Sequence, residues 1–516
     1  MNGAESLVKT LLASGVDVCF ANPGTSEMHF VAALDAQPQM RCILCLFEGG
    51  ATGAADAYFR MTGKVAATLL HLAPGFGNGF ANLHNARKAR SAVVNIMGDH
   101  ASYHLAYESP LKGDTAGISR VVSHWTKTCE AASFVAVDGA AAVTAAQSMG
   151  GQIATLILPA NTAWENADAA AVSTAPPALR RPSIDRVRAA AQTLQTKGAS
   201  LMVDGLALRG SLAQLAAKIA KKSGCALLAP FFVSRIQRGA GAVKFQRLAY
   251  VVEENSAVLK DQTSIVLCGA KRPANFFAYP GKPSLPEPAG CAIYDLCEPE
   301  MDYAWTLHAL ADELGAHHIT LGNEELQPLA LPALPSGAMS LQKVGEAIAA
   351  LMPENTVVVE EAITSAGAMA LATRHARPHD WMMINGGAIG GGLPMSIGAA
   401  VACPDQKVLC LSGDGSAMYT LQALWTMARE QLDVTVVIFS NRGYQILRGE
   451  LANVGVTDVG RNAVRMLDVA EPTLDWVALA KGHGVAGIRV RDAGEFVSAF
   501  QGAMKQKGPF LIEVMC

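Results

Sequence analysis

The sequence is poor in charge. Asp, Glu, Lys and Arg make up 16% of the 516 residues, whereas hydrophobic residues make up 51%. A chain with few charged residues and many apolar ones has little material for a solvated surface. This composition favours an oligomer with large apolar interfaces over a monomer. The formal net charge is only -3, and no local run of Lys or Arg stands out. Composition therefore gives no electrostatic case for nucleic-acid binding.

Segments for export or membrane insertion are also missing. The opening stretch MNGAESLVKTLLASG reads as an amphipathic helix without the basic and apolar regions of a signal peptide. No run of about 18 uninterrupted apolar residues occurs, which argues against a membrane span. The eleven cysteines are an odd number in a long chain and fit reduced cytosolic thiols better than a disulfide framework. We therefore expect a cytoplasmic protein, in which Cys42 and Cys45 of the CxxC are buried strand thiols.

What the chain does contain is a repeated alternation of short apolar strands and helical stretches. Two proline-rich linkers, VSTAPPALRRPS (172–183) and LQPLALPALPSG (326–337), divide the alternation into three blocks. Alternating strands and helices predict parallel sheets covered by helices. We predict an α/β protein with three doubly wound parallel-sheet domains, at 1–170, 183–325 and 340–516.

One connection in the third block carries polar side chains that an ordinary turn does not need. The strand KVLCLS is followed by Asp414, a predicted helix from Ser416 to about Gln431, and the strand VTVVIFS, after which comes Asn441. A helix of that length rises about 24 Å, and the second strand returns a similar distance. Asn441 should therefore lie beside Asp414 at the carboxyl edge of a parallel sheet.

Such a pair of side chains suits a divalent metal. Carboxylate and carboxamide oxygens are hard ligands for Mg²⁺ or Ca²⁺ bound together with phosphate oxygens. Gly413 and Gly415 would let the backbone approach a ligand, and Ser416 with the free amides of a helix start suits an anion. The alternative is a simple Asp-Gly turn followed by an ordinary strand-end Asn.

Gly-Asp-Gly followed after about 27 residues by Asn is similar to the signature of thiamin-diphosphate enzymes. This version resembles the pyruvate decarboxylase and acetolactate synthase group. The resemblance implies that Asp414, Asn441 and the Gly443 carbonyl hold Mg²⁺ (or Ca²⁺), which bridges the cofactor diphosphate, and that the third domain is the diphosphate-binding one. Further cofactor contacts implied by the resemblance are Gly413, Gly415, Ser416, Tyr444, Thr364 and Ser365.

The resemblance also implies a glutamate on the first, pyrimidine-binding domain. Glu48 in LCLFEGGATG follows an apolar strand, and burial there would require a partner, which the cofactor ring supplies. A helix-capping role is the alternative. NGGAIGGGLPMSIGAA (385–400) matches the segment that bends the cofactor, with Ile389 as its large apolar residue and Gly387 near the pyrimidine. In this group the site lies between two chains, which implies a homo-oligomer, with a dimer of dimers expected.

Two polar groups bear on the reaction. Thr25 in FANPGTSE and His71 in TLLHLAPG resemble the carboxylate-binding serine and proton-relaying histidine of benzoylformate decarboxylase. A lone histidine after a strand is often structural, which is the alternative for His71. His100 and His104 lie on a nearby loop, and their roles stay open. Phe276 stands where the benzoylformate enzyme has its second catalytic histidine.

Acetolactate synthases place a tryptophan where this chain has Gly449 or Glu450, and the central domain shows no convincing FAD signature. We therefore predict thiamin-diphosphate-dependent, non-oxidative decarboxylation of a small-molecule 2-oxo acid, like benzoylformate or pyruvate, with carboligation to a second carbonyl as a further outcome. The main alternative is an acetolactate synthase-type carboligase. More remote ones are a non-catalytic relative and another α/β enzyme, such as an NAD-dependent dehydrogenase, for which a dinucleotide fingerprint is missing.

Overall fold

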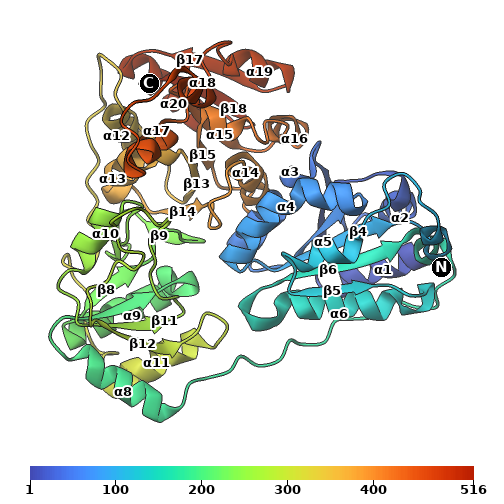
Figure 1. The fold of residues 1–516 in the computed structure, drawn as a ribbon, viewed down its shortest axis with the longest axis horizontal. Helices are drawn as coiled ribbons and strands as arrows, with labels where there is room; N and C mark the ends of the chain where they lie inside the picture. The colour runs from blue at the N-terminus through green and yellow to red at the C-terminus, as the bar shows by residue number, and fades with distance from the viewer.

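Three sheets, each flanked by helices, make up the structure, a computed structural model that describes all residues from 1 to 516 (Figure 1). In Figure 1 the N-terminal elements run from blue to teal, the central ones from green to yellow, and the C-terminal ones from orange to red. The arrangement confirms the predicted α/β class with three parallel-sheet domains. None of the helices combines the length and the apolar composition needed to cross a bilayer.

The N-terminal sheet is parallel throughout, with the strand order β2-β1-β3-β4-β6-β5. Helices α1, α2, α6 and α7 pack on one face, and α3, α4 and α5 on the other. Strands β4 and β6 are buried along their whole length, as continuous apolar runs in parallel sheets are. The bounds are α1 Gly3–Ala13, β1 Val18–Asn22, α2 Met28–Asp35, β2 Arg41–Leu44, α3 Glu48–Thr62, β3 Ala66–Leu70, α4 Leu72–Ala89, β4 Val93–Asp99, α5 Thr115–Arg120, β5 Trp125–Thr128, α6 Val135–Gln147, β6 Ile153–Pro159 and α7 Ala160–Trp164.

The edge position of β2 corrects one expectation from the sequence. Cys45, just past the strand, is buried, but Cys42 within it is exposed. Side chains alternate between the two faces of a strand, and an edge strand is covered less completely than a central one. The two thiols of the CxxC are therefore not both buried.

The central sheet is also parallel, with the order β10-β8-β7-β11-β12. The strands that SLMVDG and SIVLCG predict are β7 and β11. One strand from this part of the chain leaves the sheet: β9 pairs antiparallel with β14 of the C-terminal sheet, placing Ile236 opposite Trp381. The bounds are α8 Ile184–Leu194, β7 Ala199–Val203, α9 Gly210–Ser223, β8 Ala226–Ala229, β9 Ile236–Arg238, β10 Gln246–Arg247, α10 Val252–Leu259, β11 Ser264–Cys268, β12 Ala292–Cys297 and α11 Tyr303–Leu314.

The C-terminal sheet has seven strands in the order β17-β18-β16-β15-β13-β14-β9, and all except β9 are parallel. The predicted strands TVVVEE, KVLCLSG, VTVVIFS and FLIEVM are β13, β15, β16 and β18. The bounds are α12 Leu341–Leu351, β13 Thr356–Glu361, α13 Ala366–Ala372, β14 His379–Met383, α14 Gly392–Ala402, β15 Val408–Gly413, α15 Asp414–Ala417, α16 Ala423–Arg429, β16 Val434–Ser440, α17 Gln445–Asn453, α18 Arg461–Leu467, α19 Trp476–Gly482, β17 Ala486–Val490, α20 Ala493–Lys505 and β18 Phe510–Met515.

The single helix that we expected between β15 and β16 is two short helices, α15 and α16. Between them the Thr420 hydroxyl donates a hydrogen bond of 2.9 Å to the Gly390 carbonyl. A tertiary hydrogen bond to a distant loop thus replaces continuation of the helix at this point, which a local pattern cannot reveal. The crossover nevertheless returns β16 to the side of β15.

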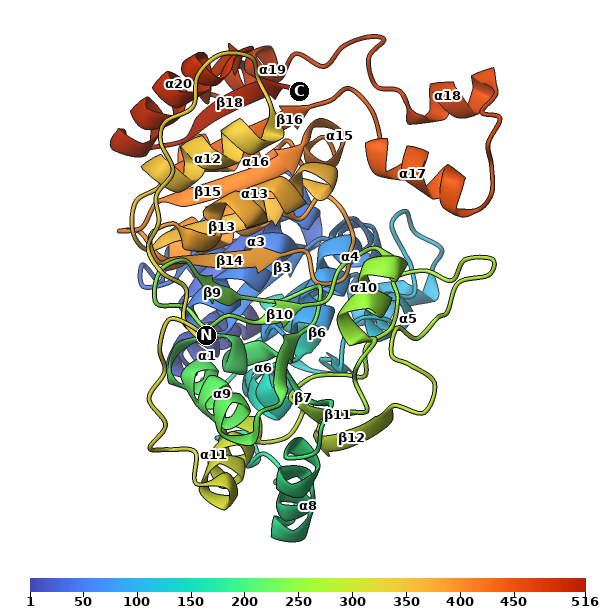
Figure 2. The same ribbon diagram turned by 90° about the vertical axis from the view of Figure 1, so that its left-hand side faces the viewer.

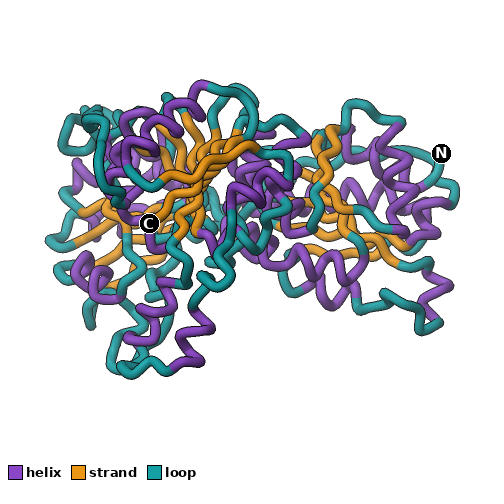
Figure 3. The backbone as a smooth tube through the Cα atoms, turned by 90° about the horizontal axis from the view of Figure 1, so that it is seen from above, coloured by secondary structure: helices purple, strands orange, loops and turns teal.

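The N-terminal domain docks on the C-terminal domain through α3 and α14. At Gly398 of α14, an added Cβ would lie 1.9 Å from the Ala54 carbonyl oxygen of α3, so the two backbones touch. Arg60, near the end of α3, is buried, pairs with Asp56, and donates to the Met383 carbonyl of the C-terminal sheet. Viewed from above, helices lie between the N-terminal strands and those of the other two sheets (Figure 3).

Candidate active site

Asp414 and the loop after β16 meet at the carboxyl edge of the C-terminal sheet. The Arg442 amide donates to Asp414 Oδ2 at 2.7 Å, and the Gly415 amide donates to Oδ1 at 2.8 Å. Asn441 Oδ1 accepts from the Gly443 amide at 3.1 Å. Burial raises the pKa of the Asp414 carboxyl, and the backbone donors oppose that shift. The structure thus brings the three candidate metal ligands, a carboxylate, a carboxamide and a carbonyl, onto two adjacent turns.

The chemistry of this donor set fits the group that the sequence predicts. All three ligand atoms would be oxygens, which Mg²⁺ prefers. Tyr444 lies over the turn, because a Cβ at Gly415 would come within 2.7 Å of its ring. Ser416 is buried at the start of α15, and its hydroxyl makes no hydrogen bond within the chain. A glycine turn with an uncommitted hydroxyl and hard oxygens is suited to a diphosphate with its metal.

The remaining diphosphate candidates, Thr364 and Ser365, lie in a short 3₁₀ turn after β13. Ser365 is buried and Thr364 is exposed. Neither hydroxyl has a hydrogen-bond partner in the chain. Because β13 pairs in parallel with β15, the turn that carries them lies at the same sheet edge as Asp414.

The glycine segment 385–392 is held by Glu361, which the sequence analysis did not single out. Its Oε1 accepts from the Gly390 and Gly391 amides at 2.6 and 2.9 Å, and its Oε2 accepts from the Gly392 amide at 3.1 Å. The Ser412 hydroxyl adds a fourth bond at 3.1 Å. Burial raises the pKa of Glu361, and the three amides oppose the shift. The Glu361 carboxylate thus accepts four hydrogen bonds inside the protein, and three of them hold the glycine segment in place.

A row of asparagines on α4 holds the other side of the segment and was also missed. Asn85 accepts from the Gly386 and Ala388 amides at 3.1 Å each and donates to the Ala388 carbonyl at 2.8 Å. Asn82 donates to the Gly390 carbonyl at 3.2 Å. The sequence did contain a signal for them: asparagine is a poor helix former, yet three asparagines, at positions 78, 82 and 85, lie on one face of a helix.

Within the held segment, Gly387 has a φ of +72° and Ile389 is partly buried against the apolar core. The Oδ1 atom of Asn385 is buried without a hydrogen-bond partner. A buried acceptor without a partner, beside a half-buried glycine turn, is typical of a site that receives a donor from a ligand. The segment therefore fits the aminopyrimidine side of the expected cofactor.

Glu48 is the first residue of α3 and is buried, with 6% of its surface exposed. Its Oε2 accepts from the Asn78 amide group at 3.0 Å, and this is its one side-chain hydrogen bond. Gly75 leaves room for the other oxygen: a Cβ there would lie 2.8 Å from Oε1. A buried carboxylate with one uncommitted oxygen requires a further donor, and the amino or ring nitrogen of an aminopyrimidine supplies one.

His71 belongs to a small network with Glu27, another residue that the sequence analysis missed. His71 Nδ1 lies 2.8 Å from Glu27 Oε2 and donates to it, because a carboxylate only accepts. The Ser26 hydroxyl donates to Glu27 Oε1 at 2.5 Å, and the Gly24 amide donates to Oε2 at 2.7 Å. Glu27 is buried, whereas the His71 side chain is 22% exposed. The imidazole is thus fixed, with Nε2 left for another partner.

Glu48 and His71 border the same glycine, since a Cβ at Gly75 would lie 3.2 Å from His71 Cβ as well as close to Glu48 Oε1. Thr25 is exposed and makes no side-chain hydrogen bond, so its neighbour Ser26 is the hydroxyl that contacts the histidine network. His100 lies near His104, with ring centroids 5.6 Å apart, and its Nε2 is buried without a partner.

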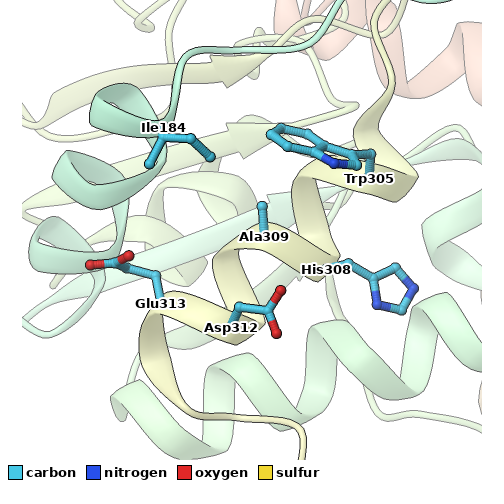
Figure 4. Close-up of a pocket in the computed structure, with 6 residues that line it drawn as sticks. All are labelled: Ile184, Trp305, His308, Ala309, Asp312 and Glu313. Atoms are coloured by element: carbon cyan, nitrogen blue, oxygen red, sulfur yellow. The ribbon is translucent and has the colours of Figure 1, made fainter.

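The central domain holds a cleft of about 340 Å³ on its surface that contains none of these residues. Figure 4 shows Ile184 and Trp305 across its upper part and Asp312 and Glu313 below, on α8 and α11. No group of three or more His, Cys, Asp or Glu side chains in the structure is arranged to bind a metal by itself. The candidate site is therefore the pair of regions at the carboxyl edges of the two outer sheets.

Residues 1–121 match the family described as thiamine pyrophosphate enzyme, N-terminal TPP binding domain, and residues 363–514 match its C-terminal TPP binding domain. The chain is 47% identical to a Mycobacterium tuberculosis protein whose name assigns it to the acetolactate synthase large subunits, over 100% of this chain and 99% of that protein. It is 28% identical to the benzoylformate decarboxylase of Pseudomonas aeruginosa, over 97% and 96% of the two chains.

The solved structures give the same fold. The thiamine diphosphate-dependent 4-hydroxybenzoylformate decarboxylase of Rhodococcus jostii superposes with a TM-score of 0.84 at 24% identity, covering 100% of this chain and 99% of that one. At that identity the match establishes a shared architecture. The family matches lie on the two domains that carry the candidate residues.

Proposed function

The chain belongs to the thiamine pyrophosphate enzymes of the decarboxylase and acetolactate synthase group, and from that membership we propose that it decarboxylates a 2-oxo acid without oxidation. The observation that carries the proposal is the Glu27–His71 pair, whose 2.8 Å contact fixes an imidazole beside Glu48. Release of an aldehyde requires a proton donor at the site, and a histidine held at one nitrogen by a carboxylate is suited to that task.

We assign the cofactor as thiamin diphosphate with Mg²⁺ (or Ca²⁺), held by Asp414, Asn441 and the Gly443 carbonyl. When bound, the cofactor would supply a carbon nucleophile for the keto group and an electron sink for the loss of CO₂. Glu48 and Gly387 would bind the aminopyrimidine, and Ile389 would support its bent shape. The diphosphate would be bound by Gly413, Gly415, Ser416, Tyr444, Thr364 and Ser365.

The chain's own groups then have distinct tasks. Glu48 Oε1 holds or accepts a proton on the pyrimidine side of the site. His71 Nε2 moves a proton to or from the substrate, while Glu27 keeps Nδ1 protonated and stabilises positive charge on the ring. The Thr25 hydroxyl, which is open to solvent, would bind the substrate carboxylate.

We propose a homo-oligomer, a dimer of dimers, with each site shared between two chains. Support comes from the composition, in which 51% of the residues are hydrophobic and only 16% are charged, a balance that favours large apolar interfaces. We place the enzyme in the cytoplasm, because its eleven cysteines are all free thiols.

A second candidate function is acetolactate synthase-type carboligation. It is favoured by the 47% identity to the Mycobacterium tuberculosis protein named for that activity. In both reactions CO₂ leaves first. The reactions differ in what the remaining acyl carbon then takes up: addition of a proton gives an aldehyde, and addition to a second carbonyl compound gives a 2-hydroxyketone.

The experiment that tests the proposal is product analysis with thiamin diphosphate and Mg²⁺, using pyruvate, 2-oxobutyrate, phenylpyruvate and benzoylformate as donors. We expect CO₂ release with an aldehyde as the main product. A hydroxyketone as the main product would replace our proposal with carboligation. Glu48→Gln should lower turnover at least about 100-fold while the protein stays folded. Near-normal turnover of that variant with cofactor bound would contradict the role of Glu48.

A further inference from the structure

Aromatic residues make up only 6% of the chain, yet five of them gather where the central domain borders the C-terminal domain. Neighbouring ring centroids in this aromatic cluster are between 4.7 and 6.1 Å apart, mostly in tilted or edge-to-face pairs. The members of the cluster are Phe231, Phe232, Tyr250, Phe276 and Phe277.

The cluster touches the candidate active site through Phe276. An added Cβ at Gly387 would lie 2.9 Å from Phe276 Cζ, so the ring contacts the backbone of the glycine segment. Phe276 is nevertheless 41% exposed, and its neighbour Phe277 is 53% exposed. Open aromatic surface beside a catalytic segment is a binding surface for an apolar group. Phenylalanine carries no titratable proton, so at this position it contributes contact area and no proton transfer.

Hydrogen bonds also connect the cluster to α17, which follows the loop of the candidate metal ligands. Glu450 on α17 accepts from the Tyr250 hydroxyl at 3.0 Å and from the Tyr279 hydroxyl at 2.6 Å. Burial and the contact with Glu450 raise the pKa of Tyr250, so its hydroxyl stays a donor. α17 begins just after the metal-binding loop 441–443, and Figure 2 shows it beside α10 and the central-domain loops. The aromatic cluster is thereby fixed between the glycine segment and the metal-binding loop.

We propose that the aromatic cluster is the subsite for the donor's side chain, and that Phe276 selects aryl and other bulky apolar 2-oxo acids over pyruvate. The inference rests on the proposed function, whose substrate class it narrows. A phenyl group buries far more apolar surface on such rings than a methyl group does. The carboxylate of Glu450 behind the rings disfavours donors that carry a second negative charge.

The kinetic test compares kcat/KM for benzoylformate, phenylpyruvate and pyruvate in the wild type and in Phe276→Ala. We expect the better aryl donor to exceed pyruvate at least about tenfold, and Phe276→Ala to remove most of that preference by lowering the aryl value. Phe276→Leu, which retains part of the apolar surface, should fall between the two. Phe134→Ala is the matched control: Phe134 is another exposed phenylalanine, in the N-terminal domain, and its loss should leave the preference unchanged.

A binding test separates this inference from the proposed function. With thiamin diphosphate and Mg²⁺ present, mandelate and lactate imitate benzoylformate and pyruvate without being decarboxylated. Calorimetry should show mandelate binding at least about tenfold more tightly than lactate, in the wild type and Phe134→Ala but not in Phe276→Ala. Selective mandelate binding without turnover of any donor would refute the proposed function and leave the subsite standing.

Three results would overturn the subsite. They are equal binding of mandelate and lactate by the wild type, a loss in Phe276→Ala that is the same for every donor, and dissociation of the oligomer by Phe276→Ala in sedimentation velocity. The last result would show that the aromatic cluster is a contact between chains.

Discussion

Buried glutamates in this chain behave differently according to the donors that surround them. Glu361 accepts four hydrogen bonds and has no capacity left, so it serves structure. Glu48 accepts one from the protein and keeps an oxygen for a ligand. Glu27 orients a histidine. For a single residue, the number of hydrogen bonds that a carboxylate accepts from the protein therefore distinguishes a structural glutamate from one that can still bind a ligand.

Glu27→Gln tests whether Glu27 acts through His71. The substitution keeps the shape of the side chain but removes the negative charge that stabilises a protonated imidazole. We expect kcat to fall about 10- to 100-fold while KM changes little. Ser26→Ala, which removes a neighbouring hydrogen bond without removing charge, is the control. An equal loss of kcat in Ser26→Ala would indicate that Glu27 has a merely structural role.

Glu360 provides a pH-dependent term in stability. Burial raises its pKa to about 7, well above the ordinary value of 4.5. The folded state therefore binds a proton more tightly than the unfolded state, and stability falls as pH rises from 4.5 through 7. The loss amounts to about 3 kcal/mol at most. Glu360→Gln, which is always neutral, should unfold at a higher temperature than the wild type at pH 8 and at a similar one at pH 5. Equal melting differences at both pH values would contradict this.

At the scale of the element, α4 matters because one of its faces binds a loop from another domain. Asn85 alone satisfies two amides and one carbonyl of the glycine segment. Asn85→Ala would leave those backbone groups unpaired and let the segment relax. We expect thiamin diphosphate to bind about tenfold more weakly, as measured by quenching of protein fluorescence. Asn166→Ala removes an exposed asparagine of the same domain and should leave the affinity unchanged.

The elements that were predictable from the sequence are those whose signal is local. Strands such as β15 and β16 are continuous apolar runs, and parallel topology places their ends together, so Asn441 could be expected near Asp414. The Arg442 amide, one residue further on, makes the hydrogen bond to Asp414. The Glu27–His71 contact joins residues 44 positions apart, and Asn85 binds Ala388 across 303 positions. The first contact arises where β1 and β3 pair inside the N-terminal sheet, and the second arises where the N-terminal domain docks on the C-terminal one. Neither local sequence specifies its partner.

At the scale of the whole molecule, α3 and α14 position the N-terminal domain against the C-terminal one. Gly398→Ala would place a methyl group 1.9 Å from the Ala54 carbonyl oxygen and force the helices apart. We expect a loss of about 1–3 kcal/mol, seen as a lower midpoint of thermal unfolding. Gly502→Ala is the matched control, because Gly502 lies in α20 with open space around its Cα. That variant should be neutral or slightly stabilising.

The strand β9 has a consequence for exchanging parts between enzymes of this kind. It comes from the middle of the chain but completes the edge of the C-terminal sheet beside β14. Recombination at the proline-rich linkers would exchange the central domain as a unit. It would also replace β9, the edge strand of the C-terminal sheet. A donor segment lacking an equivalent of Ile236–Arg238 would leave the backbone of β14 open to pairing with other molecules. By pairing with β14, the strand from the middle of the chain thus protects the C-terminal sheet from edge-to-edge aggregation.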